Sequence, residues 1–262
     1  MEFRTLYHEI MDYEGDNIFD EVLKISTEKN SSKEYLSSLD VFNLSQEDNW
    51  ELYALSRVLD ILTLKFQPNN NKDGCDWLGA NITLNEYEKF AELLGLKVLY
   101  PKVFHAFDCE IFESIPGENN FEIVKISIPS LWLKNLMIKR AGVTTTNNPK
   151  DYDLNLINDA CIFWAFRRKN RGYYDESQGW GSNSQWRTRF RIDIETETSY
   201  IYNIDGKYSL NDPTDKALIE VREQKLELQK AIELLKNRLC INDTVDSDWA
   251  YPYNFKYVEY KI

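Results

Sequence analysis

The spacing of apolar residues changes from helical to alternating near residue 97, and this change limits the folds open to the chain. Before it, apolar residues recur every three or four positions, over about 17–28, 46–66 and 83–94. After it, extended or alternating runs predict strands over about 97–100, 103–107, 109–114, 121–128, 186–195, 200–204 and 254–260. Helices and strands segregated in this way favour an α+β fold over a doubly wound sheet. We expect a helical N-terminal part, a central mostly antiparallel sheet and a long amphipathic helix near the C-terminus.

Two of the expected helices carry recognisable ends. Ser45 is placed to cap the helix that follows it, and Glu47 and Asp48 lie in the first turn, where the helix dipole favours acids. Thr83 and Glu86 have the spacing of a capping box, which predicts a helix start at residue 84.

The second half gives four further expectations. Residues 131–140 could form a short helix, and the apolar run 160–166 predicts a buried central strand. Asp205-Gly206 is a hairpin signal. Residues 214–239 predict one long amphipathic helix, although Lys225 interrupts its apolar seam. The polar stretch 142–153 is the best candidate for a loop, and for a subdivision of an otherwise single globular domain, 1–262.

The charge of the chain argues against some partners. The 262 residues carry a formal net charge of −12, which disfavours nucleic acids and anionic membranes and favours a basic protein partner. Acids cluster at Asp12, Glu14, Asp16, Asp20 and Glu21, and again at Glu47, Asp48 and Glu51. Either cluster could be a docking patch or simply a solvated face. No apolar run of membrane-spanning length and no secretory leader is expected, so we expect a cytoplasmic protein.

The residues that usually carry catalysis or bind metals are sparse. His8 and His105 are the two histidines, and the four cysteines are widely spaced, without a CxxC pair. His105 lies near Asp108, Cys109 and Glu110, but a histidine packed beside aromatic residues explains it better than a metal site does. Glycine-rich phosphate loops and nucleophile elbows are absent from the sequence. We therefore expect no catalytic residue, no metal and no cofactor.

The segment 167–191 concentrates basic residues in an acidic chain and supplies the candidate binding residues. These are Asp175, Trp180, Asn183, Gln185, Arg187, Arg189 and Arg191. Three interpretations remain open. The arginines could pair with nearby acids such as Glu195 or Glu197, they could form a protein-contact surface with Trp180, or they could bind an anion beside Asp175 or Glu176.

The overall character is acidic, aromatic-rich and free of catalytic signatures, which is typical of proteins that bind other proteins. Bacterial immunity proteins, which neutralise toxins by stoichiometric complex formation, have such a character. We therefore expect an immunity-type inhibitor of a basic toxin. The alternatives are an enzyme or binding protein for an anionic small molecule, using 167–191, and an assembly component that oligomerises through the helix 214–239.

Overall fold

The computed structural model describes residues 2–68, 77, 79–118, 122–147, 153–177, 185–241 and 250–261. Its helices are α1 (Glu2–Met11), the π-helix η1 (Phe19–Leu23), α2 (Lys24–Asn30), α3 (Ser32–Ser38), α4 (Gln46–Leu62), the short 3₁₀ turn η2 (Leu64–Phe66), α5 (Leu84–Leu93), α6 (Leu154–Asp159), α7 (Asp215–Glu223), α8 (Leu228–Asn237) and the 3₁₀ turn η3 (Pro252–Asn254). The strands are β1 (Lys97–Leu99), β2 (Cys109–Pro116), β3 (Glu122–Ile128), β4 (Ser130–Leu133), β5 (Leu136–Lys139), β6 (Ala141–Asn147), β7 (Ile162–Phe163), β8 (Tyr173–Tyr174), β9 (Ile194–Glu195), β10 (Ser199–Tyr202), β11 (Tyr208–Ser209) and β12 (Phe255–Tyr260). The fold is α+β, as the segregated periodicity predicts.

A seven-stranded sheet forms the centre of the molecule. Its order is β1-β4-β5-β9-β10-β12-β11, and its pairs are antiparallel except β11 with β12. A second sheet has the order β2-β6-β3, with β2 parallel to β6, and β7 pairs with β8. The prediction of a mostly antiparallel sheet is confirmed.

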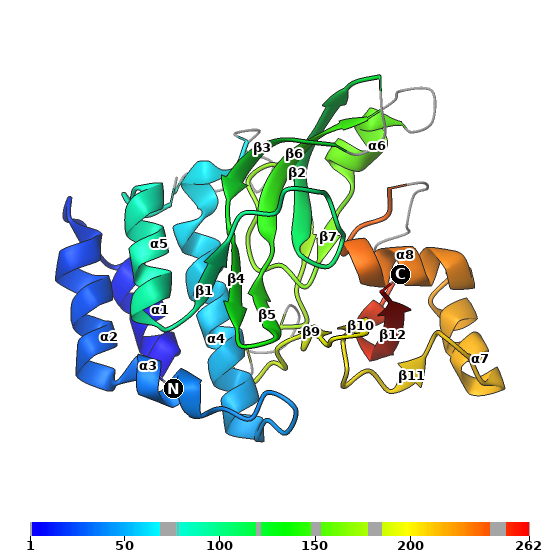
Figure 1. Cartoon of the computed structure of the whole chain (residues 1–262), viewed down its shortest axis with the longest axis horizontal. Helices are drawn as coiled ribbons and strands as arrows, with labels where there is room; N and C mark the ends of the chain where they lie inside the picture. Colours follow the sequence, from blue (N-terminus) through cyan, green and yellow to red (C-terminus); the bar gives the residue numbers. More distant parts are fainter. Residues whose placement is uncertain are drawn as a thin grey trace.

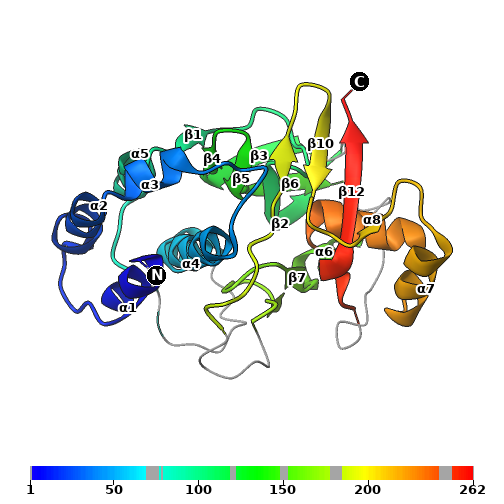
Figure 2. The same cartoon turned by 90° about the horizontal axis from the view of Figure 1, so that it is seen from below.

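Helices cover both sides of the large sheet, with α1 to α5 on one side and α7 and α8 on the other (Figure 1). Alternation along β4 shows how the sheet serves two cores. Leu131 and Leu133 pack with the N-terminal helices, whereas Trp132 between them packs in the cluster that contains Leu234 and Leu235 of α8. Figure 2 shows the same arrangement from below, with α4 between α1 and the sheet.

The N-terminal helices form where their caps predict. Ser45 and Asp48 make a complete capping box for α4, and Thr83 and Glu86 make one for α5. The helix α4 is buried over most of its length, so it is the central helix of this part. Glu51 on α4 accepts hydrogen bonds from the backbone nitrogens of Glu2 at 2.9 Å and Phe3 at 3.2 Å, and it thereby caps α1.

Residues 131–140 are a hairpin of β4 and β5, so the expected short helix is wrong. The run LWLKNLMIK contains short apolar stretches that periodicity alone cannot assign to helix or strand. Lys134 takes a left-handed conformation (φ 55°) between the two strands, which closes the turn.

The long helix expected over 214–239 is two helices, which corrects that part of the fold prediction. Lys225 adopts φ 53°, and this left-handed residue ends α7 before α8 begins at Leu228. Val221, Ala231, Leu234 and Leu235 are buried against the chain's own core. The apolar face is therefore used inside the molecule, and a continuous oligomerisation seam over 214–239 is not formed.

Several other predicted strands are shorter than expected or absent from the described structure. Within 186–195, β9 covers Ile194–Glu195, while the backbone nitrogen of Phe190 donates to the side chain of Asn49 at 2.5 Å rather than to a neighbouring strand. The apolar run 160–166 contributes the short strand β7, and residues 103–107 lie outside the strands. Asp205-Gly206 does not close a hairpin, because β11 pairs with β12 and not with β10.

The polar stretch 142–153 begins as a strand and not as a loop. Residues 141–147 form β6, which lies at the centre of the β2-β6-β3 sheet and is mostly buried. Its threonines are typical of strands. Residues 148–152 lie outside the described residues. Within the described residues, no helix is long and apolar enough to cross a membrane.

We predict that Thr83→Ala destabilises the protein by about 1 kcal/mol, because the Thr83 hydroxyl accepts a hydrogen bond from the Glu86 backbone at 3.2 Å. Urea unfolding followed by circular dichroism measures the change. Thr198→Ala, at an exposed threonine outside any helix, is the control and should change stability little. Equal losses in the two variants would contradict the assigned cap.

Candidate functional site

Four charged residues from distant parts of the chain meet in the interior, and we call them the Asp60 cluster: Asp60, Glu110, Lys139 and Arg168. Arg168 donates to both oxygens of Glu110, at 2.6 and 2.9 Å, and its Nη1 lies 3.0 Å from Asp60. Lys139 forms an ion pair with Asp60. Burial alone raises the pKa of Asp60 and of Glu110, but the charges of Arg168 and Lys139 and the hydrogen bonds to the carboxylates together outweigh it, so both values fall to about 2. The cluster is electrically neutral.

A second group, the Asp193 cluster, is not neutral. Asp193 accepts from Arg191 at 2.7 Å, from Arg140 at 3.3 Å and from Arg238 at 3.3 Å. Its Oδ1 also accepts from the backbone nitrogen of Asn203 at 2.9 Å. Burial opposes ionisation of Asp193, yet the three guanidinium groups lower its pKa to about 2. One carboxylate is thus the shared counter-ion of three buried guanidinium groups.

The whole interior has the same imbalance. Among the described residues, nine basic side chains are buried: Arg57, Lys139, Arg140, Arg167, Arg168, Lys169, Arg171, Arg191 and Arg238. Four acidic ones are buried: Asp60, Glu110, Asp175 and Asp193. Within the described residues the buried set carries five formal positive charges in excess, so the other described residues are correspondingly more acidic.

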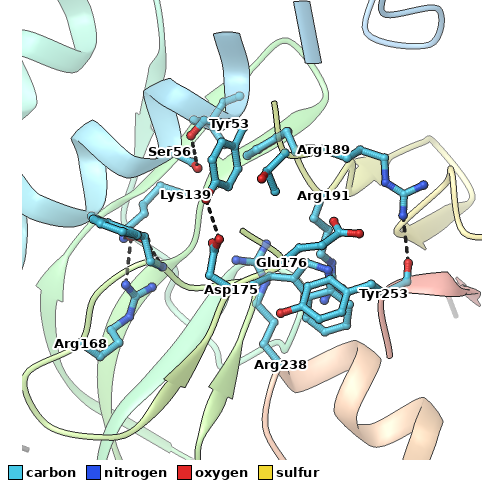
Figure 3. Close-up of a pocket in the computed structure, with 16 residues that line it drawn as sticks. Tyr53, Ser56, Lys139, Arg168, Asp175, Glu176, Arg189, Arg191, Arg238 and Tyr253 are labelled. Atoms are coloured by element: carbon cyan, nitrogen blue, oxygen red, sulfur yellow. Dashed lines mark hydrogen bonds and ion pairs between the residues drawn. The ribbon is translucent and has the colours of Figure 1, made fainter. Parts of the chain in front are cut away.

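A pocket lies between the two clusters (Figure 3). Its lining includes Asp60, Lys139 and Arg168 from one cluster and Arg191 and Arg238 from the other. The remaining wall is formed by Tyr53, Ser56, Ile138, Trp164, Phe166, Asp175, Glu176, Thr188, Arg189, Phe190 and Tyr253. The pocket has about 30 Å³ of room for the centres of water-sized molecules, enough for roughly two or three waters.

Two adjacent carboxyl groups face this pocket. Asp175 is buried and accepts hydrogen bonds from the hydroxyls of Tyr53 and Ser177, both at 2.5 Å, and from the Ser177 backbone at 2.8 Å. Burial raises its pKa despite these donors. Glu176 is half-buried and accepts from the Tyr251 hydroxyl at 3.0 Å, and burial raises its pKa while Arg189 opposes the rise. Carboxyl groups with raised pKa values beside cations are typical of binding and catalytic pockets.

The structure separates the arginines that the sequence places in one row. Arg187 is exposed and lies over the Trp50 ring at 5.4 Å. Arg189 donates to the carbonyl oxygens of Asp205 at 3.2 Å and Tyr253 at 2.9 Å. Arg191 is buried at Asp193. The three arginines do not form a row, because residues 186–193 are not part of a hydrogen-bonded strand. Each guanidinium group therefore contacts a different partner.

Three of the seven candidate binding residues line the pocket: Asp175, Arg189 and Arg191. Gln185 and Arg187 do not line it. Trp180 and Asn183 lie outside the described residues. Glu195, proposed as a partner of the arginines, instead pairs with Lys261 at 2.8 Å. A binding role for the seven residues stays a prediction.

Arg238, Lys139, Tyr53 and Asp60 line the pocket but were missed from the sequence. A signal was available for two of them, because Asp60 interrupts the apolar run VLDIL and Lys139 ends the apolar run LMIK. If such a run packs in the core, its charged residue has to be paired, because Asp and Lys are almost never fully buried without a partner. For Arg238 and Tyr53 we find no such signal.

The surroundings of the acids, cysteines and histidines bear on the question of a metal site. Within the described residues, no group of three or more His, Cys, Asp or Glu side chains could hold a metal ion. His105 stacks on Tyr200 with ring centroids 4.4 Å apart, away from the pocket lining. Burial lowers its pKa. The histidine beside aromatic residues is confirmed, although it directly precedes the turn 106–108 and does not lie in a strand.

No protein-family model, curated protein or solved structure matches this chain.

We predict a large loss of stability for one buried aspartate and a small change for another. Asp193→Asn should cost about 3–5 kcal/mol of unfolding free energy, because three buried guanidinium groups lose their counter-ion. Asp175→Asn should change it by less than about 1 kcal/mol, because an amide oxygen can still accept from Tyr53 and Ser177. Urea unfolding at pH 7 measures both. Similar losses would contradict the difference between the two environments.

Acid should unfold the protein through the same carboxylates. The folded-state pKa values of Asp60, Glu110 and Asp193, each about 2, lie below the unfolded values near 4. Their stabilisation is present above pH ~4.5 and is lost as the pH falls towards 2, by on the order of 2 kcal/mol each. Asp175, with its raised pKa, opposes this loss in part. Urea midpoints that stay constant from pH 5 to pH 2.5 would contradict the assignment.

Proposed function

We propose that this chain is a binding protein that forms a stoichiometric complex with a basic protein, of the kind that bacterial immunity proteins form with toxins. The observation that carries the proposal is the division of charge between interior and exterior. Because the buried residues hold a surplus of five cations, the other described residues are together more acidic than the described part of the chain as a whole. A surface of this charge accelerates encounter with a basic partner. We place this complex in the cytoplasm.

The N-terminal helices supply a groove suited to such a partner. It lies between α1 and the η1–α2 segment and has about 760 Å³ of room for water-sized molecules. Its acidic members are Glu2, Glu9, Asp12 and Glu21, against the single basic residue Lys29.

Apolar contact is also available in this groove. Val22 and Tyr13 line it, and Ile25 is 55% exposed there. An apolar strip with acidic edges suits a basic amphipathic segment of a partner, for which the apolar contacts give affinity and the charges give orientation.

The acids expected to form a docking patch divide into two sets. Asp48 belongs to the cap of α4, and Glu51 caps α1, so both stabilise helices. Asp12 and Glu21 are exposed and line the groove, where Glu9, an exposed acid outside the predicted clusters, joins them. The proposal therefore rests on the groove set.

The experiment is affinity capture from the native source with three baits. They are the wild-type chain, a groove variant (E9K/D12K/E21K) and a charge-matched control on exposed acids near α7 and α8 (D212K/E223K/E227K). We expect one basic protein at near-equal stoichiometry, bound at least roughly 10-fold more weakly by the groove variant and within about 3-fold of wild type by the control. Affinity should also fall with added salt.

Two results would overturn the proposal. One is equal binding of the basic partner by the groove variant and the control. The other is that no basic protein is enriched by the wild-type bait at low salt. A captured partner that is toxic when expressed alone, and harmless together with this chain, would establish the immunity role.

A further inference from the structure

The Asp193 cluster lacks counter-charge. Arg140, Arg191 and Arg238 together bring three positive charges to one carboxylate, and all four side chains are at least nine-tenths buried. The backbone carbonyls of Lys236 and Leu235 help by accepting from Arg140 at 2.7 Å and from Arg191 at 2.5 Å. Carbonyl dipoles do not cancel two whole charges, and uncompensated buried charge is strongly unfavourable.

The same cluster has unused donors beside the pocket. Nη1 of Arg191 and Nε of Arg238 are buried and have no hydrogen-bond partner within the described part of the chain. Both side chains line the pocket. Buried donors of charged groups are nearly always satisfied in native proteins, so their presence at a pocket points to an acceptor that enters from it.

The carboxylates of the pocket cannot fill this role as they stand. Asp60 is held by Lys139 and Arg168, and Asp175 is held by Tyr53 and Ser177. Glu176 accepts from Tyr251 at 3.0 Å, on the side towards Arg189.

We propose that the pocket bordered by Arg191 and Arg238 binds a phosphate-type oxyanion. The surplus of two positive charges matches the charge of −1.5 to −2 that a phosphate monoester carries near pH 7. Guanidinium groups fit the oxygens of phosphate better than ammonium groups do. The proposal is independent of the complex with a basic protein, because the groove on α1 and α2 shares no residue with this pocket.

The size of the pocket limits the ligand to one such group. Room for roughly two or three waters suits a single phosphate and excludes a whole nucleotide. The rings of Trp164 and Tyr253 lie in the wall, with centroids 4.8 Å apart, and could contact an organic group attached to the phosphate. The anion is therefore either free phosphate or the phosphoryl end of a larger molecule.

The test is titration calorimetry and thermal unfolding with inorganic phosphate, at constant ionic strength set with potassium chloride. We expect saturable binding that raises the midpoint of thermal unfolding. Arg238→Gln should weaken binding at least roughly 10-fold, the loss of one charge-assisted contact. Arg187→Gln, an exposed arginine of the same segment outside the pocket, should bind like wild type.

A second variant keeps the test decisive if Arg238→Gln does not fold. Glu176→Gln changes a half-buried side chain and removes a negative charge from the pocket, so it should tighten phosphate binding about 3-fold or more. Phenyl phosphate separates the two sources. Tighter binding than inorganic phosphate indicates the phosphoryl end of a larger ligand, and equal or weaker binding indicates the free anion.

The proposal is overturned if neither inorganic phosphate nor phenyl phosphate gives saturable binding. It is also overturned if folded Arg238→Gln and Glu176→Gln both bind phosphate as the wild type does. In that case the anion sits on the surface and not at the Asp193 cluster.

Discussion

Asp193 holds three guanidinium groups in the interior, and the packing around it depends on those contacts. Arg140 follows β5, Arg191 precedes β9, and Arg238 ends α8, so one carboxylate joins the large sheet to the C-terminal helix. The Asp60 cluster plays the corresponding part on the other side, where it joins α4 to β5, β2 and the segment after β7. Apolar side chains pack on both faces of the sheet. The two ionic clusters fix the positions of the helices on those faces.

This placement of cations also shapes the exterior. A chain that buries arginines leaves its acids facing water, and it becomes more acidic at its surface than its composition indicates. The acidic groove and the cationic pocket are thus two results of one distribution of charge. They attract ligands of opposite sign, and they lie on different elements.

The sequence predicts the fold class and the capped helices well, because periodicity and caps are local. Ser45 and Thr83 fix the starts of α4 and α5 without help from distant residues. The sequence predicts local structure and ion-pair partners poorly where contacts between distant residues determine them. The hairpin 130–139 and the break at Lys225 depend on which face each short run buries, and the partner of Arg191 depends on where Asp193 is brought in three dimensions. Likewise, Asp175 could be selected from its neighbours, whereas Arg238 reaches the same pocket only through the position of α8.

The spacing of the Asp60 cluster along the chain bears on how the protein assembles. Its members lie at positions 60, 110, 139 and 168, so forming the cluster closes loops of tens of residues. Such long-range closures slow folding, since their entropic cost precedes the contacts that compensate for it. A partly assembled chain that buries Arg168 without Asp60 is strongly disfavoured. Burial of Arg168 and the docking of α4, which carries Asp60, therefore favour each other during assembly.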